Sequence, residues 1–247
     1  MRGVAVDNNA SRPPEHIVDY RFDARGRQMA SARPNTRIPC LEPPRRRQVA
    51  VMFADLDHFT QLCSEAPPEA VFRLVRDFQR VVARSVSSCN GTLNGFAGDG
   101  AMATFRDLAG RADCATRALK CAWSVLERIQ VLNLEYGRVG AWSVSVSIGL
   151  QYGQALFGGI TSSRGFGSTI IGDAVNVASR LEQRARALST KIVVGDELVQ
   201  RARRESGTDA SELTPLAYIG SLSLDGRAAP VGAWIFQASA PSAHAGR

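Results

Sequence analysis

Two aspartates stand where strands of this chain are expected to end. Asp99 lies at the tip of LNGFAGDGAMATF, which has the pattern of a strand, a tight turn and a second strand. Asp55 closes QVAVMFADL, an apolar run typical of a buried strand. If that strand lies beside the hairpin, the two carboxylates repel each other unless a cation lies between them. Mg²⁺ suits such a pair, because its remaining ligands are water and phosphate oxygens.

The same two residues have a purely structural interpretation. Glycine and aspartate are ordinary in hairpin turns, and an aspartate at a strand end caps the next turn. The spacing alone is compatible with two aspartates that only stabilise turns and with a two-metal phosphoryl-transfer site. The following stretch, DLDHFT, favours the second, because backbone N–H groups in such a turn, at Phe59 and Thr60, can hold phosphate oxygens.

A third polar motif opens a predicted helix. In IIGDAVNVASRLEQ, Asn176 and Arg180 are four residues apart and share one helical face. Arginine offers a fork of donors for phosphate oxygens, and asparagine can orient a hydroxyl. The alternative is a solvated pair on the helix surface.

Hydrophobic periodicity predicts the elements that position these motifs. Helices are expected over 69–87, 111–131, 173–187 and 195–204. Strands are expected from residue 48, in the hairpin, over 141–152, near KIVVG and as a pair around 216–236. A Gly-rich loop spans residues 158–167. The order from 48 to 152 is the ferredoxin-like split βαβ plan, so we predict an α+β fold with a C-terminal helix and strand extension.

Charge is concentrated near the N-terminus. Ten arginines but five acidic residues fall in residues 1–50, so +5 of the net charge of +7 lies there. Residues 1–47, rich in Arg and Pro, are predicted to be a flexible arm, and residues 238–247 a disordered tail. A nucleic-acid-binding or membrane-surface arm is the alternative. A solvated extension is favoured, so we expect no nucleic-acid partner.

The cysteines and histidines argue against several other chemistries. The five cysteines form no CxxC pair, and the three histidines are scattered, which disfavours a zinc site or a His-based triad. No run of 18 apolar residues and no secretion signal is present, so neither a membrane span nor export is expected. We expect a cytoplasmic protein with reduced thiols.

Together, VAVMFADLDHFTQL, NGFAGDGAMATF and TIIGDAVNVASRLE resemble the three signature segments of the class III nucleotidyl cyclases. This family comprises the catalytic domains of adenylate and guanylate cyclases, and the resemblance, strongest to bacterial adenylate cyclases, covers residues 48–237. It implies that this span is the catalytic domain. It also implies that Asp55 and Asp99 bind two Mg²⁺ or Mn²⁺ ions, with the carbonyl of Leu56 as a further ligand.

The resemblance further implies how the substrate is handled. Asn176 would position the ribose, and Arg180 would stabilise the α-phosphate while the ribose 3′ oxygen attacks it and pyrophosphate leaves. The site would be shared in a homodimer, with Asp55 and Asp99 from one protomer and Asn176 and Arg180 from the other.

The base-reading positions depart in part from the family pattern. Gly95 stands where adenylate cyclases usually have lysine and guanylate cyclases tend to have glutamate. Thr169 fills the second position with a hydroxyl, as in bacterial adenylate cyclases. Arg227 is a candidate to hold the terminal phosphates, although Asp225 stands where a basic residue is expected.

Three interpretations of Gly95 are open: Asn94 or a backbone carbonyl reads adenine, the pocket takes GTP or a pyrimidine nucleotide, or the enzyme is weak and promiscuous. We favour the first, which predicts cyclic AMP from ATP. An alternative of another class is a catalytically silent cyclase-homology domain. Since Asp55, Asp99, Asn176 and Arg180 are all present, the enzyme is favoured.

Overall fold

A computed structural model describes residues 43–138, 143–162, 165–206 and 211–237. Residues 1–42 of the predicted arm and the whole predicted tail, 238–247, lie outside the described residues. The elements, in chain order, are β1 (Arg45–Leu56), α1 (Phe59–Glu65), α2 (Pro68–Ser88), β2 (Thr92–Ala97), β3 (Gly100–Phe105), α3 (Cys114–Arg138), β4 (Val146–Ser162), β5 (Gly165–Ile171), α4 (Asp173–Ala187), β6 (Ile192–Gly195), α5 (Asp196–Ser206), β7 (Leu216–Leu222) and β8 (Val231–Phe236).

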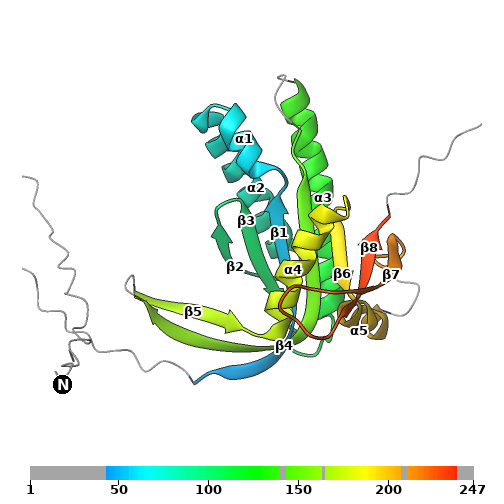
Figure 1. The fold of residues 1–247 in the computed structure, drawn as a ribbon. Helices are drawn as coiled ribbons and strands as arrows, with labels where there is room; N and C mark the ends of the chain where they lie inside the picture. The colour runs from blue at the N-terminus through cyan, green and yellow to red at the C-terminus, as the bar shows by residue number, and fades with distance from the viewer. Residues whose placement is uncertain (1–42, 139–142, 163–164, 207–210, 238–247) are drawn as a thin grey trace, which may run out of the picture. The chain divides into compact units, whose positions relative to one another are not determined.

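One sheet connects all the strands (Figure 1). Its order is β2-β3-β1-β4-β6-β8-β7, with β5 pairing β4 off this path. The first four strands are antiparallel neighbours in the order of the split βαβ plan. β6 then adds parallel to β4, and β8 and β7 complete the far edge. The predicted α+β fold with its C-terminal extension is therefore confirmed.

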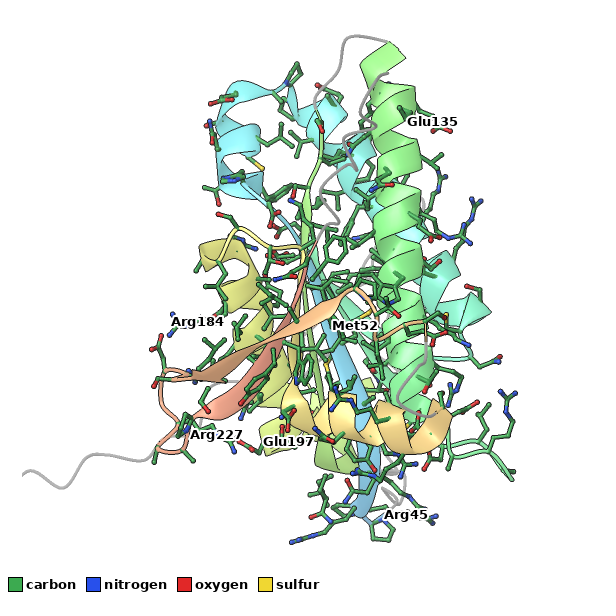
Figure 2. All side chains as sticks on the ribbon, turned by 90° about the vertical axis from the view of Figure 1, so that its right-hand side faces the viewer. Arg45, Met52, Glu135, Arg184, Glu197 and Arg227 are labelled. Carbon is green, nitrogen blue, oxygen red and sulfur yellow. The ribbon has the colours of Figure 1, made fainter. Side chains whose placement is uncertain are left out.

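Helices cover both faces of this sheet. On one face α2, α3 and α5 enclose the larger core, whose fully buried side chains include Met52, Phe78 and Leu119. Figure 2 shows Met52 within the side-chain layer between β1 and α3. On the opposite face α4 buries Ala174 and Ala178 against the strands. The helix that carries Asn176 and Arg180 thus packs on the face away from α2 and α3.

The segment predicted as a Gly-rich loop is a hairpin instead. β4 continues to Ser162 and β5 returns from Gly165, with Gly158 opposite Thr169 in the ladder. β1 also begins at Arg45, three residues before the predicted start, and pairs there with Phe157. The pairing of β1 with β4 joins residues that are distant in sequence, and the glycines of the β4–β5 hairpin made its strands look like a loop. The predicted helix at 111–131 runs from 114 to 138.

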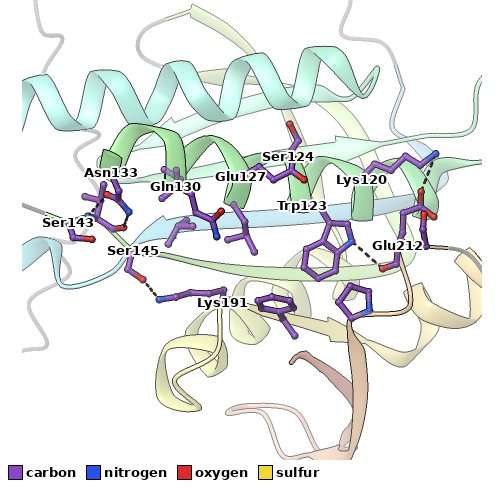
Figure 3. A pocket seen from close by; sticks show the side chains of 17 residues that line it. Lys120, Trp123, Ser124, Glu127, Gln130, Asn133, Ser143, Ser145, Lys191 and Glu212 are labelled. Carbon is purple, nitrogen blue, oxygen red and sulfur yellow. Dashed lines mark hydrogen bonds and ion pairs between the residues drawn. The ribbon is translucent and has the colours of Figure 1, made fainter. Parts of the chain in front are cut away.

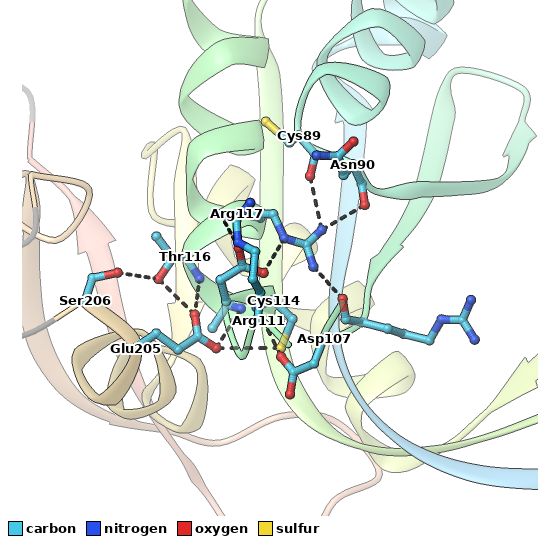
Figure 4. A network of polar contacts seen from close by, with 12 residues as sticks. Cys89, Asn90, Asp107, Arg111, Cys114, Thr116, Arg117, Glu205 and Ser206 are labelled. Carbon is cyan, nitrogen blue, oxygen red and sulfur yellow. Dashed lines mark hydrogen bonds and ion pairs between the residues drawn. The ribbon is translucent and has the colours of Figure 1, made fainter. Parts of the chain in front are cut away.

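Buried polar contacts fix the beginning of α3 (Figure 4). Glu205 of α5 accepts hydrogen bonds from the backbone N–H groups of Ala115 (3.2 Å) and Thr116 (2.8 Å), which satisfies donors that the first helical turn leaves unpaired. Arg117, only 6% exposed, donates to the carbonyls of Cys89 (3.1 Å) and Asn90 (2.8 Å) at the end of α2. The two core helices are thereby held together at this end.

Gly149 of β4 sets the position of α4. A Cβ atom at this residue would lie 2.2 Å from both the carbonyl oxygen of Ala178 and the backbone nitrogen of Glu182. The clash is with helix backbone, which no rotamer change can relieve. Only glycine therefore lets α4 approach the sheet this closely.

We predict that Gly149→Ala destabilises the fold by about 2 kcal/mol or more, because α4 must move away from β4. Urea unfolding followed by circular dichroism measures the change. Gly95→Ala is the matched control, since a Cβ atom there meets nothing within 4 Å. Equal stability of the two variants would contradict this account of how α4 is positioned.

Candidate active site

The structure brings Asp55 and Asp99 together at one end of the sheet. Asp55 pairs in register with Gly100, and the backbone N–H of Leu56 donates to the carbonyl of Asp99 at 3.3 Å. A Cβ atom at Gly100 would lie 3.0 Å from a carboxylate oxygen of Asp55. Burial raises the pKa of Asp99, and the neighbouring Asp55 raises it further. The pair therefore carries the repulsion that a bound cation would relieve.

Two further acidic residues lie in the same cluster. Asp57 follows β1 and accepts a hydrogen bond from Ser147 at 2.6 Å. Glu182 of α4 is buried, and burial raises its pKa to about 7, with a further contribution from Asp55. We call Asp55, Asp57, Asp99 and Glu182 the acidic cluster.

Arg186 of α4 supplies a positive charge to the acidic cluster. Its guanidinium lies 2.7 Å from Asp55, 3.0 Å from Glu182 and 3.5 Å from Asp57. The sequence reasoning missed this residue. The available signal was its position four residues after Glu182, which places both on one face of α4.

The donor set of the cluster fits a hard divalent cation. The carboxylate oxygens of Asp55 and Asp99 and the backbone carbonyl oxygen of Leu56 are of the ligand type that Mg²⁺ and Mn²⁺ prefer. The Arg186 guanidinium already shows that a cation is accommodated at Asp55.

Asn176 and Arg180 lie elsewhere on α4. Asn176 is exposed in the first turns of the helix. Arg180 faces the turn between β7 and β8, where a Cβ atom at Gly226 would lie 3.3 Å from its guanidinium. Among the described residues, no hydrogen bond or ion pair joins either of them to Asp55 or Asp99.

Arg227 lies in the same β7–β8 turn and is partly exposed (Figure 2). It forms an ion pair with Asp173 at the start of α4 and donates to the carbonyl of Ala229 at 3.1 Å. Asp225, beside it in the sequence, is exposed. The structure thus places Arg180 and Arg227 around one turn.

A β-bulge lies in β2 beside Gly95, the position that the family resemblance assigns to base reading. Leu93 pairs with Ala103 and Gly95 pairs with Met102, so Asn94 is an extra residue in β2. Asn94 and Thr169 line one cavity of about 400 Å³, together with residues that include Arg45, Arg47, Arg106 and Phe157. Gly95 is exposed and is not among the residues that line it.

Phe59 and Thr60 are the first two residues of α1. They follow His58, which adopts a left-handed conformation with φ of 59°. The turn after Asp55 therefore leads directly into a helix, as the sequence indicates.

Asp107, Cys114 and Glu205 form a separate group whose ligand atoms lie within 4.8 Å of one another. Their partners explain the group without an ion, because Arg201 lies 2.7 Å from Glu205 and 2.8 Å from Asp107. Glu205 also caps α3. Cys63, Cys89, Cys114 and Cys121 are all free thiols. None of the described helices is long and apolar enough to cross a bilayer.

Comparison with known proteins identifies the family of this chain. The family described as "Adenylate and Guanylate cyclase catalytic domain" matches residues 41–228. An adenylate cyclase of Anabaena cylindrica is 28% identical over 155 residues, which cover 62% of this chain and 30% of that protein. The chain therefore spans about a third of the length of this relative.

Solved structures share the fold. The adenylyl cyclase CyaB from P. aeruginosa superposes with a TM-score of 0.68 at 22% identity, covering 81% of this chain and 98% of that one. The guanylyl cyclase Cya2 gives a TM-score of 0.66 at 22% identity, covering 81% and 96%. Given the family match over most of its length, the chain belongs to the adenylate and guanylate cyclase catalytic domain family.

Proposed function

We propose that this chain converts a nucleoside triphosphate, with ATP preferred, into the 3′,5′-cyclic nucleotide and pyrophosphate. The observation that carries the proposal is the adjacent pair Asp55 and Asp99, held in register at the end of the sheet beside a compensating cation. A domain that only signalled by binding partners would not need two repelling carboxylates there.

The proposed roles follow from the chemistry of each group. Asp55, Asp99 and the carbonyl of Leu56 would hold two divalent ions, which activate the ribose hydroxyl and neutralise the triphosphate when bound. The N–H groups of Phe59 and Thr60 would face phosphate oxygens. Asn176 would orient the ribose, and Arg180 would contact the α-phosphate as its charge develops. Arg227 would hold the terminal phosphates.

A homodimer with shared sites is part of the proposal. In one protomer Asp55 is paired with Arg186, whereas Arg180 lies at the β7–β8 turn. Ile171, the last residue of β5, is 63% exposed, which suits a residue beside a protein interface. A second protomer would bring Asn176 and Arg180 to the acidic cluster of the first.

Asn94 is the proposed reader of the base. Its amide can pair with the N6 and N7 atoms of adenine, a pairing that asparagine commonly makes. It lines the same cavity as Thr169, the other base-reading position, and so takes the place of the side chain that Gly95 lacks.

The activity is tested by incubating the purified chain with ATP, GTP, CTP or UTP and Mn²⁺, and identifying the products by mass spectrometry. We expect cyclic AMP as the main product and at least a hundredfold loss of its formation in Asp99→Asn, because one metal ligand loses its charge. If no cyclic nucleotide forms from any substrate, the chain is a silent cyclase-homology domain.

The same assay tests base selection. Asn94→Ala should lower the preference for ATP over the other triphosphates by roughly 5-fold to 150-fold, the effect of losing about 1–3 kcal/mol of hydrogen bonding to the base. Gly95→Ala is the control and should leave the preference unchanged. An effect confined to Gly95→Ala would assign base reading to that position instead.

Shared sites predict complementation between inactive variants. Asp55→Ala and Arg180→Ala should each be nearly inactive alone, and mixing them should restore about a quarter of wild-type activity, since random pairing leaves one intact site in half of the dimers. The measurement is cyclic nucleotide formation after the variants are mixed and exchanged. No recovery, despite exchange of protomers seen by native mass spectrometry, would contradict the shared site.

Arg186 competes with metal at Asp55, so its removal should tighten metal binding. For Arg186→Met we expect Mn²⁺ to bind roughly fivefold more tightly without nucleotide, the equivalent of about 1 kcal/mol for a partly exposed ion pair. Isothermal titration calorimetry measures the affinity. Arg184→Met is the control, because Arg184 donates to the carbonyl of Ser223 at 2.8 Å and has no contact with the acidic cluster. Weaker binding in Arg186→Met would show that Arg186 supports the metal site.

A further inference from the structure

A cavity of about 710 Å³ lies between α3, the beginning of β4 and the ends of β6 and β8 (Figure 3). It shares no lining residue with the cavity at Asn94 and Thr169. Its volume is in the range of small-molecule binding sites. The proposed cyclase chemistry does not use it.

The middle of the cavity is apolar. Trp123 and Phe236 lie with their ring centroids 5.2 Å apart and tilted at 60°. Further apolar lining comes from Leu126, Ile129, Val144, Val146 and Pro215. The indole N–H of Trp123 donates to the carbonyl of Glu212 at 3.1 Å, which fixes the orientation of the ring. A preformed apolar floor of this kind suits a hydrocarbon or aromatic body.

The two ends of the cavity each carry a lysine, and their surroundings differ. At one end Lys120 pairs with Glu212 at 3.3 Å, so its charge is matched by a single close carboxylate. At the other end Lys191 contacts the hydroxyl of Ser145 and lies 3.6 Å from Asp57. That distance is longer than a strong ammonium–carboxylate hydrogen bond.

Lys191 can bind a further anion without leaving Asp57 unpaired. Asp57 also accepts hydrogen bonds from Ser145 and from Ser147 (2.6 Å), and Arg186 lies 3.5 Å away. The lysine ammonium has three rotatable donors and is 46% exposed. Of the two lysines among the described lining residues, Lys191 therefore offers the more available cationic group.

We propose that this cavity binds a small organic monocarboxylate, with its carboxylate on Lys191 and its apolar body against Trp123 and Phe236. Gln130, which lies on α3 opposite Lys191 in Figure 3, lines the same cavity and carries a side-chain donor for the second carboxylate oxygen; Ser143 lines the cavity as well. Because Lys191 lies 3.6 Å from Asp57 of the acidic cluster, only this lysine side chain would separate the bound carboxylate from Asp57. The ligand would therefore lie where it can influence the proposed active site.

Calorimetric titration of the full chain with hexanoate, octanoate, octan-1-ol and octyltrimethylammonium tests the proposal. Octanoate should bind with one-to-one stoichiometry and about tenfold more tightly than hexanoate, since each buried CH₂ contributes roughly threefold to fourfold. Octan-1-ol should bind at least about tenfold more weakly than octanoate, and octyltrimethylammonium should not bind. Equal binding of the alcohol and the carboxylate, or no binding of octanoate, would overturn the proposal.

Three variants locate the site. Lys191→Gln should weaken octanoate binding about tenfold, whereas Lys120→Gln, the matched control at the other end, should leave it unchanged. Gln130→Trp should abolish binding by filling the cavity from an exposed position of α3, with the fold checked by urea unfolding. A loss of affinity in Lys120→Gln alone, or full binding in Gln130→Trp, would overturn the proposed site. Since binding is measured without nucleotide, this result is independent of whether the chain is a cyclase.

Discussion

The repulsion among carboxylates at one end of the sheet is the constraint on which the site depends. Asp55 and Asp99 are adjacent because β1 and β3 pair in a fixed register, and Glu182 is added because α4 packs close to β4. Like charges brought together with partial burial destabilise a fold unless a cation compensates them. In this protomer Arg186 provides part of that compensation. A bound divalent ion would provide more, which gives the acidic cluster its proposed affinity for metal.

The close packing of α4 also determines which of its residues reach the acidic cluster and which remain exposed. Its inner face presents Glu182 and Arg186 to the acidic cluster of its own protomer, whereas Asn176 lies exposed near its other end. The rise of 1.5 Å per residue separates Asn176 from Glu182 by roughly 9 Å and from Arg186 by roughly 15 Å along the axis. A single protomer therefore cannot easily bring both ends of α4 to the same phosphate, which is the physical reason for proposing a second protomer.

The parts predicted from the sequence were those encoded by local patterns. The helices at Pro68 and Asp173 showed their apolar periodicity, and the hairpin that carries Asp99 showed its turn residues. The β4–β5 hairpin was not predictable in this way, because Gly158 and Gly159 are read as loop residues until β5 pairs with them. Arg186 was missed for a related reason: its partners Asp55 and Asp57 lie about 130 residues away in sequence, so no local pattern indicates the contact.

The bulge at Asn94 separates the cavity proposed to read the base from the acidic cluster. The acidic cluster depends on the pairing of Asp55 with Gly100, which the bulge between Leu93 and Gly95 leaves intact. The cavity at Asn94 and Thr169 depends on the bulge and on the β4–β5 hairpin, neither of which contributes to the acidic cluster. Gly95, which is not among the residues that line this cavity, can thus differ from the family pattern without disturbing Asp55 or Asp99. The absence of lysine at this position is consequently no argument against the proposed cyclase activity.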